Sequence, residues 1–184
     1  MSAVFDPAPL AGVVVVRPTL HRDARGFFLE TFRAESYARA GIATSFAQEN
    51  HSRSRRGVLR GLHYQITHTQ GKLVRVARGR VWDAVVDLRR GSPTFGRGFG
   101  LVLDDERGTA LWVPPGCAHG YLTLSEEADF LYACTDVWDP AGERTIRWDD
   151  PDLALAWPLA ESGPPVVSEK DARGLPFRDA PLFP

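Results

Sequence analysis

The sequence has little cysteine and no long hydrophobic segment. Cys117 and Cys134 are its only cysteines, which is too few for a disulfide scaffold, and they do not have the spacing of paired zinc ligands. The apolar run at residues 10–16 is short and follows no basic segment, so it predicts neither a signal peptide nor a transmembrane helix. The sequence therefore indicates a cytoplasmic protein that does not enter a membrane.

Lysine is almost absent, and neither sign of charge dominates. The formal net charge of −1 argues against a general attraction to nucleic acid or to anionic membranes. Only Lys72 and Lys170 among the 22 basic residues are lysines, a bias that a GC-rich genome would explain by itself. Alternatively, Lys72 serves a task that needs a compact point charge, which arginine does not provide.

Motifs for metals and dinucleotides are also missing. The five histidines include no His-x-His pair, and His63 and His68 are five residues apart, so a facial site of histidines and a carboxylate is not expected. The stretch "GRGFG" at residues 96–100 has its third glycine misplaced for a dinucleotide fingerprint, and no βαβ pattern surrounds it. We therefore expect neither a metal nor a cofactor.

Short β-type runs, by contrast, recur along the whole chain. They predict a hairpin over residues 72–88 and strands over residues 12–20, 109–113, 120–125 and 128–138. Helix patterns are confined to residues 33–41 and to one turn at 168–172. This pattern predicts a single all-β domain over residues 1–184, a jelly-roll sandwich or barrel that holds a ligand in its mouth.

Polar side chains alternate along two of the predicted strands. Gln48, Asn50 and Ser52 share one face of an extended segment, and a solvent-facing edge is the simpler explanation for them. Tyr132 lies inside the apolar run "FLYAC" and shares strand parity with Trp138. A buried phenol needs a hydrogen-bonding partner, so Tyr132 is either a packing residue or a catalytic proton donor.

The stretch "GVLRGLHYQ" at residues 57–65 combines an arginine and a histidine with an apolar strand. Arg60 and His63 have opposite parity, so a regular strand would point them to opposite faces. Gly61 between them could host a bulge that re-aims one side chain. Asp171, at the end of "SEKD", either belongs to a helix-capping box or hydrogen-bonds a histidine and fixes its tautomer.

Together these stretches resemble the dTDP-4-dehydrorhamnose 3,5-epimerase family, sugar-nucleotide epimerases with a cupin-like jelly roll. The matching segments span nearly the whole chain in the family's order and include "DARGFFLETF", "QENHS", "GVLRGLHYQ", "QGKLVRVARGRVWDAVVDLRRGSPTFG", "VPPGCAHGY", "LYACTDVWDPAGERTIRWDDP" and "SEKDA". The resemblance implies an isomerase without cofactor or metal, acting on a dTDP-4-dehydro-6-deoxyhexose. The C4 ketone acidifies the protons on C3 and C5, which are removed and returned from the opposite face.

The resemblance implies a chemical role for four residues. His63 would be the base, since the unperturbed pKa of histidine lies near neutrality, and Asp171 would be its carboxylate partner. Tyr132 would be the acid on the other face of the sugar. Lys72 would stabilise the oxyanion that develops at O4.

The resemblance also implies the substrate-binding positions. Arg60 would bind the pyrophosphate, whose oxygens a guanidinium matches in pairs. The other positions implied within the same chain are Gln48, Asn50, His119, Glu143 and, more loosely, Lys170. Trp138 stands where the family commonly has a tyrosine that stacks on thymine; its larger ring preserves stacking but lacks the hydroxyl group.

Arg25 and Glu30 match residues that, in this family, reach the nucleotide of a neighbouring subunit. The resemblance therefore implies a homodimer that shares its sites between subunits. Three alternatives to double epimerisation remain: epimerisation at C3 or C5 alone, isomerisation of the ketone between C3 and C4, and non-catalytic binding of a sugar nucleotide. The pathway, either cell-surface rhamnose or a deoxysugar of a secondary metabolite, stays open.

Overall fold

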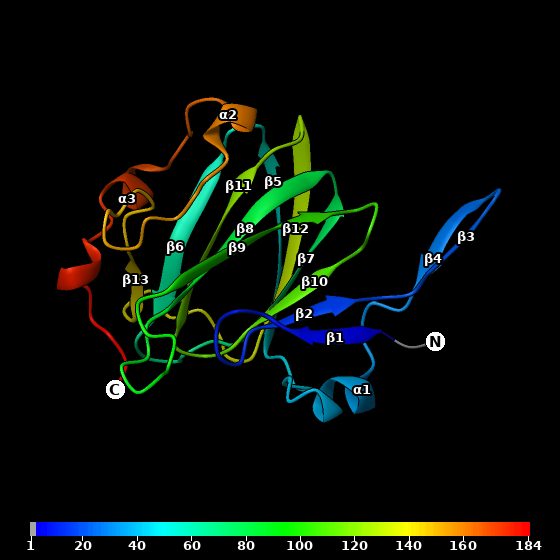
Figure 1. Cartoon of the computed structure of the whole chain (residues 1–184), viewed down its shortest axis with the longest axis horizontal. Coiled ribbons are helices and arrows are strands. Elements are labelled where there is room, and N and C mark those ends of the chain that lie inside the picture. The colour runs from blue at the N-terminus through cyan, green and yellow to red at the C-terminus, as the bar shows by residue number, and fades with distance from the viewer. Residues whose placement is uncertain (1–2) are drawn as a thin grey trace.

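Two antiparallel sheets face each other in the computed structural model, which describes residues 3–184 (Figure 1). In spatial order the six-stranded sheet contains β1 (Val4–Pro7), β2 (Val14–Arg17), β10 (Ala110–Val113), β7 (Lys72–Arg78), β12 (Glu127–Cys134) and β5 (Gln48–Arg55). The five-stranded sheet contains β13 (Glu143–Thr145), β6 (Leu59–Gln65), β11 (Cys117–Thr123), β8 (Arg80–Asp87) and β9 (Gly98–Asp104). This arrangement confirms the predicted all-β jelly-roll sandwich.

Alternating apolar residues of both sheets form the core between them. Val74 and Val76 of β7 point inward and meet Val81 and Val85 of β8 and Phe130 of β12, all of them buried. Burying one such side chain stabilises the fold by about 1.5–3 kcal/mol. This shared core holds the two sheets at a fixed separation, which in turn fixes the polar residues at their open edge.

The predicted hairpin over residues 72–88 is wrong. β7 pairs with β10 and β12, whereas β8 pairs with β11 and β9, so consecutive strands belong to opposite sheets. Gly79, with φ +82°, makes the corner between them. A glycine turn between two apolar strands is compatible with a hairpin and with a crossing to the opposite sheet. Here the valines of β7 and β8 pack against each other across the core, and this packing favours the crossing.

Two further strand boundaries differ from the prediction. β11 begins at Cys117 rather than at residue 120, which places His119 inside a strand. β12 ends at Cys134 rather than at residue 138, so Trp138 lies in a loop and does not share a strand face with Tyr132. From Asp136 onward the chain has left the sheet, and side chains rather than a neighbouring strand bind its backbone groups.

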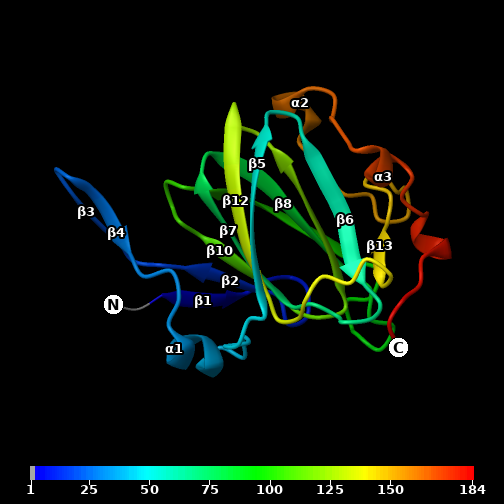
Figure 2. The ribbon, with the colours of Figure 1, turned by 180° about the vertical axis from the view of Figure 1, so that it is seen from behind.

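Helices are few and short, as predicted. α1 (Ala34–Arg39) precedes Gly41, whose φ of +74° terminates the segment. α2 (Leu159–Ser162), α3 (Glu169–Ala172) and a 3₁₀ turn (Phe177–Asp179) follow the last strand. They lie beside β6 and β13, on the outside of the sandwich (Figure 2). No helix among residues 3–184 has the length and hydropathy needed to span a bilayer.

A bulge at Gly61 re-aims the residues of β6. His63 pairs with His119 and Arg60 pairs with Tyr121, so three steps along β6 match two steps along β11. Gly61 has φ +121°, a backbone conformation that glycine adopts readily. The irregularity brings Arg60 and His63 to the same face of the sheet, which confirms the predicted bulge.

We expect Gly61→Ala to destabilise the fold by about 2–4 kcal/mol, because a Cβ atom there would add strain and overpacking. That Cβ atom would lie 2.7 Å from the Gly120 Cα atom and 2.8 Å from the His119 carbonyl oxygen. Urea denaturation measures the loss. Gly91→Ala is the matched control, since its Cβ atom would meet nothing within 4 Å; equal stability of the two variants would contradict the bulge.

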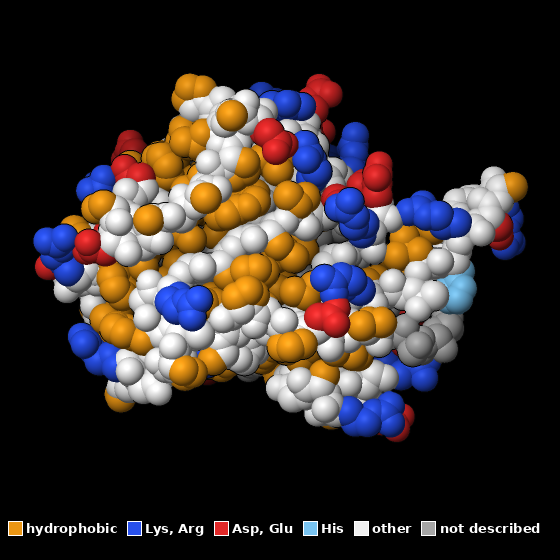
Figure 3. Space-filling view, viewed as in Figure 1, with side chains coloured by type: hydrophobic (Ala, Val, Ile, Leu, Met, Phe, Trp, Pro, Cys, Tyr) orange, Lys and Arg blue, Asp and Glu red, His pale blue; other side chains and the backbone are white. Residues whose placement is uncertain are grey.

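A two-stranded hairpin, β3 (Leu20–Asp23) and β4 (Gly26–Leu29), projects from the body of the sandwich (Figures 1 and 2). The space-filling view shows it standing clear of the body, with hydrophobic side chains at its root (Figure 3). Phe27 and Phe28 are 53% and 59% exposed. Successive side chains of a strand point to opposite faces, so the hairpin exposes one aromatic ring on each of its faces.

Candidate active site

A cleft of about 290 Å³ lies at the open edge between the two sheets. One wall comes from β5, β7 and β12, and the other from β6 and β13. The cleft is lined by Gln48, Asn50, His63, Tyr64, Gln65, Gln70, Lys72, Tyr132, Trp138 and Glu143. We call this the catalytic cleft, because it gathers most of the residues that the sequence singled out.

His63 and Asp171 form a hydrogen-bonded pair at one side of the cleft. The His63 Nε2 atom lies 2.6 Å from the Asp171 Oδ1 atom. Asp171 is 3% exposed, and its own backbone N–H donates to the Ser168 hydroxyl group at 3.1 Å. Helix capping and histidine binding therefore coexist: Ser168 caps α3, and α3 holds the Asp171 carboxylate against the imidazole.

Burial and pairing set the charges of this pair. Burial lowers the pKa of His63 below its ordinary value, and the hydrogen bond to Asp171 opposes that shift only in part. Burial alone would raise the pKa of Asp171, but the hydrogen bond from His63 and its charge, together with smaller contributions from Ser168 and Lys170, outweigh burial, and the net shift is downward. A neutral imidazole whose Nε2–H donates to a carboxylate keeps a lone pair on Nδ1. His63 is thus prepared to accept a proton.

Tyr132 approaches the cleft from the opposite sheet. It belongs to β12 and pairs with Asn50 of β5. Burial raises the pKa of its phenol, so the hydroxyl group stays protonated near neutral pH. Across residues 3–184 no other group hydrogen-bonds to this hydroxyl. The Tyr132 hydroxyl group is therefore free to donate to a ligand in the cleft.

Lys72 lines the cleft from the same sheet as Tyr132. It starts β7 directly opposite Cys134, and it makes no ion pair within the part of the chain that the structure describes. Burial lowers the pKa of Lys72, and the carboxylates of Glu143 and Asp83 oppose that shift. An unpaired ammonium group in a confined site strongly favours any negative charge that develops beside it.

His119 belongs to β11 and pairs with His63 of β6. Its side chain is held by the carboxylate of Asp83. Its Nε2 atom lies 2.9 Å and 3.1 Å from the two carboxylate oxygens of Asp83, which is fully buried. Asp83 is not among the site residues predicted from the sequence. An acidic residue inside the apolar stretch "VWDAVV" is the signal that points to it, since a buried carboxylate requires a partner.

Arg60 lies on the same face as His63, next to Ser54 and Tyr121. Its Nε–H donates to the Ser54 hydroxyl group at 3.1 Å, and Ser54 also lies 3.1 Å from the Tyr121 hydroxyl group. Arg60 makes no ion pair among the described residues. Its terminal guanidinium nitrogens are therefore available to an anionic ligand, although Arg60 does not itself line the catalytic cleft.

Gln48 and Asn50 face the cleft rather than solvent. The Gln48 side chain accepts from the Trp138 backbone N–H at 2.8 Å and donates to the Asn50 side chain at 2.9 Å. The alternation seen in the sequence thus identifies the inner face of β5. Glu143 and Lys170 also meet at the cleft, where their side chains form an ion pair of 2.9 Å.

Arg25 and Glu30 are not brought to the cleft of their own chain. Arg25 pairs with Asp23 at the projecting hairpin, and Glu30 pairs with Arg33 just after it. Both residues lie away from the other predicted site residues of the chain. If they contribute to a nucleotide site, that site belongs to a second subunit.

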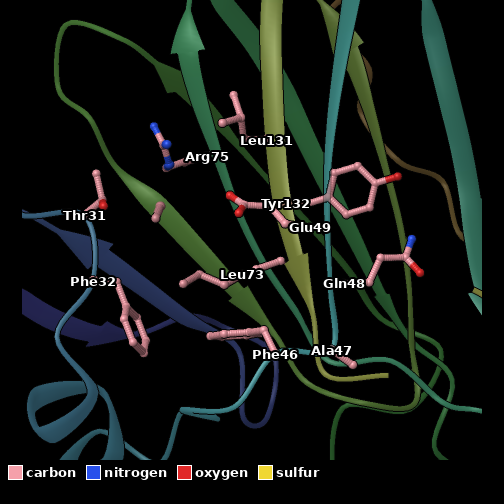
Figure 4. A pocket seen from close by; sticks show the side chains of 12 residues that line it. Thr31, Phe32, Phe46, Ala47, Gln48, Glu49, Leu73, Arg75, Leu131 and Tyr132 are labelled. Atoms are coloured by element: carbon pink, nitrogen blue, oxygen red, sulfur yellow. The ribbon is translucent and has the colours of Figure 1, made fainter. Parts of the chain in front are cut away.

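A second hollow, of about 340 Å³, lies on the outer face of the six-stranded sheet (Figure 4). Its wall includes Phe32, Phe46, Leu73 and Leu131. The Tyr132 ring points away from these side chains, to the other side of β12 (Figure 4). We call this the outer hollow; it is more apolar than the catalytic cleft, although Glu49 and Arg75 also line it. Across residues 3–184 no cluster of histidine, cysteine and carboxylate side chains has a metal-binding arrangement.

Comparison with known proteins gives one consistent family. The sequence model of the dTDP-4-dehydrorhamnose 3,5-epimerase family matches residues 7–179. A relative of that name from Pseudomonas aeruginosa is 52% identical over 173 residues, covering 94% of each chain.

Solved structures agree with the sequence comparison. An epimerase of Legionella pneumophila in complex with dTDP-4-keto-L-rhamnose superposes with a TM-score of 0.94 at 42% identity, covering 99% of this chain and 98% of the other. A 3′-monoepimerase of Streptomyces bikiniensis in complex with dTDP-quinovose superposes with a TM-score of 0.87 at 38% identity, covering 94% and 87%. On these similarities, the chain belongs to the dTDP-4-dehydrorhamnose 3,5-epimerase family.

Proposed function

We propose that this chain epimerises C3 and C5 of dTDP-4-dehydro-6-deoxy-D-glucose and yields dTDP-4-dehydro-L-rhamnose. One observation carries the proposal: a base, His63, and an acid, Tyr132, enter the catalytic cleft from opposite sheets. A sugar held between them would lose a proton on one face and gain one on the other. Such a transfer inverts the carbon without any redox step.

The first step is proton abstraction by His63. Its Nδ1 lone pair takes the proton from a carbon next to the C4 ketone, and the C–H electron pair moves to make an enolate with the charge on O4. Asp171, 2.6 Å from Nε2, stabilises the imidazolium that forms. A positioned general base of this kind contributes about 10²–10⁴-fold to a rate.

Lys72 then stabilises the enolate, and Tyr132 completes the inversion. The Lys72 ammonium group has no ion pair to break among the described residues, so it is free to attract the developing charge on O4. His119, fixed by Asp83 at 2.9 Å, is a second candidate donor to that oxygen. The Tyr132 hydroxyl group protonates the carbon from the opposite face. Before the next inversion the phenolate regains a proton from solvent, and the His63 imidazolium releases its proton to solvent.

The rest of the substrate would extend along the open edge of the sandwich. Arg60, with free terminal nitrogens, suits the pyrophosphate. The Glu143–Lys170 pair would bind the polar groups between sugar and nucleotide. Gln48 and Asn50 border the same space, and Trp138 offers a flat surface to the base.

Product analysis separates this proposal from its alternatives. Purified chain is incubated with dTDP-4-dehydro-6-deoxy-D-glucose, and NMR coupling constants report the configuration at C3 and C5. Inversion at both carbons supports the proposal. Inversion at only one would make the chain a monoepimerase, a shifted ketone would make it a 3,4-ketoisomerase, and unchanged substrate with tight binding would make it a non-catalytic binding protein.

The acid limb of the pH–kcat/KM profile is expected below pH 6.5. His63 acts only when neutral, and because burial lowers its pKa below 6.5, it remains neutral at lower pH than a free histidine. In Asp171→Asn the carboxylate no longer raises the pKa of His63, so the limb should move further toward acid while the rate falls. A limb above pH 7, or an upward shift in Asp171→Asn, would contradict this assignment.

We propose further that the chain acts as a homodimer with shared sites. The proposal is supported by the exposed Phe27 and Phe28 of the projecting hairpin and by the apolar outer hollow, a surface that a second copy could cover. The hairpin would carry Arg25 and Glu30 to the partner's nucleotide.

A mixed dimer tests this sharing. Chains carrying His63→Asn and Arg25→Ala are given different tags, co-expressed and purified through both tags. If Arg25 serves the partner's site, one of the two sites contains both native residues, and the mixed dimer should show about half of the activity of the unaltered dimer. If Arg25 serves its own chain, both sites are defective and the activity should match that of the weak parent variants.

We propose also that residues 1–184 form one domain and that the protein is located in the cytoplasm. A core shared by both sheets supports the first. The buried, unpaired thiols of Cys117 and Cys134 support the second, because free cysteines are typical of a reducing compartment.

A further inference from the structure

Gln65 holds the loop that carries Trp138 from both sides. Its side-chain N–H groups donate to the Val137 carbonyl oxygen at 3.2 Å and to the His68 carbonyl oxygen at 2.7 Å. Its side-chain oxygen accepts from the Asp139 backbone N–H at 2.9 Å. The amide of Gln65 thus binds the residues immediately before and after Trp138.

Two more glutamines bind the same loop. The Gln48 side-chain oxygen accepts from the Trp138 backbone N–H at 2.8 Å. The Gln70 side chain donates to the Asp136 carbonyl oxygen at 2.9 Å. All three glutamines line the catalytic cleft, and we call them the glutamine cradle. The cradle binds a backbone group of every residue from 136 to 139.

The Trp138 side chain itself is left free. It is 56% exposed and makes no aromatic or cation–π contact with another described residue, whereas Gln65 is only 4% exposed. The backbone that carries the indole ring is therefore what these amides order. The amide of Gln65 is buried and its hydrogen bonds would be costly to lose, whereas Gln48 and Gln70 are half-buried. A loop backbone held in place before binding saves the entropy of ordering it.

We propose that the glutamine cradle fixes Trp138 as a preformed stacking surface for the nucleobase, and that Gln65 and Gln70 are positioning residues for nucleotide binding. This inference rests on the proposed function, which supplies the nucleobase. It also gives Gln48 an indirect role through Trp138, in addition to any direct contact with the substrate.

Calorimetry with dTDP and with inorganic pyrophosphate tests the cradle. Gln65→Met keeps the side-chain size but removes its hydrogen bonds, and it should weaken dTDP binding about tenfold. Pyrophosphate has no base, so its affinity should change less than about twofold. In turnover the loss should appear in KM rather than in kcat, because the base lies away from the reacting carbons.

A double-mutant cycle shows whether Gln65 acts through Trp138. In a Trp138→Ala chain the further change Gln65→Met should alter dTDP affinity by less than about twofold, since the residue that it positions is gone. Ser125→Ala is the matched control: its hydroxyl group binds the Glu127 carbonyl oxygen at another turn, and its loss should leave dTDP affinity unchanged.

Two outcomes would overturn the proposed role of the glutamine cradle without affecting the proposed function. One is additive losses of dTDP affinity in the double variant, and the other is an equal loss of affinity for dTDP and for pyrophosphate. Failure of the unaltered chain to bind dTDP would overturn the proposed function and the cradle together. Binding of dTDP without any epimerised product would overturn the proposed function and leave the cradle supported by the cycle.

Discussion

His63→Asn should lose proton exchange at both C3 and C5 by about 10³-fold or more, because one imidazole serves as the base at both carbons. Asparagine retains the size and a hydrogen bond toward Asp171 but has no basic nitrogen. Exchange is measured in deuterium oxide by NMR of the substrate pool. The affinity for dTDP should change less than about threefold, since the base does not touch the nucleotide.

His51→Asn is the matched control for this variant. His51 lies on β5 but pairs with Asp129 at the surface, 3.1 Å away, and does not line the catalytic cleft. Its loss should leave exchange unchanged. Near-normal exchange in His63→Asn, or loss at one carbon only, would mean that another group removes at least one of the protons.

Tyr132→Phe should separate exchange from inversion. Without the hydroxyl group the enolate still forms at His63 and can take deuterium back from the same side, so exchange should fall less than about tenfold. Net inversion, which needs a donor on the opposite face, should fall by about 10²-fold or more. Both quantities come from one NMR time course, as deuterium content and as product configuration.

Tyr37→Phe is the corresponding control, because its buried hydroxyl group donates to the Thr31 carbonyl oxygen away from the cleft, at 2.8 Å. This variant should lose some stability and keep the ratio of inversion to exchange. A Tyr132→Phe chain that is folded but loses exchange and inversion equally would show that Tyr132 assists the first step instead.

Local pattern was sufficient to group residues on one face of a strand, but not to say that this face points inward: the simpler expectation of a solvent-facing edge for Gln48 and Asn50 is wrong. Alternation predicted that Gln48 and Asn50 share a face, and the glycine between Arg60 and His63 predicted a bulge; both are confirmed. These features depend on residues that are close in sequence, because successive side chains of a strand point to alternate faces of the sheet.

The partners of those residues could not be predicted in the same way. Whether β7 and β8 pair as a hairpin or cross between sheets depends on packing across the core, which no local turn signal specifies. Likewise, the Asp171 carboxylate meets His63 although 108 residues separate them in the chain. The residues alone left open whether Asp171 caps a helix or binds a histidine, and only the family resemblance implied that the histidine is His63.

The glutamines of the cradle were missed for a related reason. Gln65 and Gln70 look like ordinary polar residues near the ends of strands, and the prediction extended the strand of Tyr132 as far as Trp138. Their role becomes visible only when the loop after Cys134 leaves the sheet and takes its hydrogen bonds from side chains.

The most direct test of the central claim is the deuterium content of the product after turnover in deuterium oxide. The account predicts product with deuterium at both C3 and C5, each carbon inverted, from an unaltered chain given no metal or cofactor. Deuterium at a single carbon would contradict double epimerisation. Inversion without any deuterium would contradict proton abstraction by a base that exchanges with solvent.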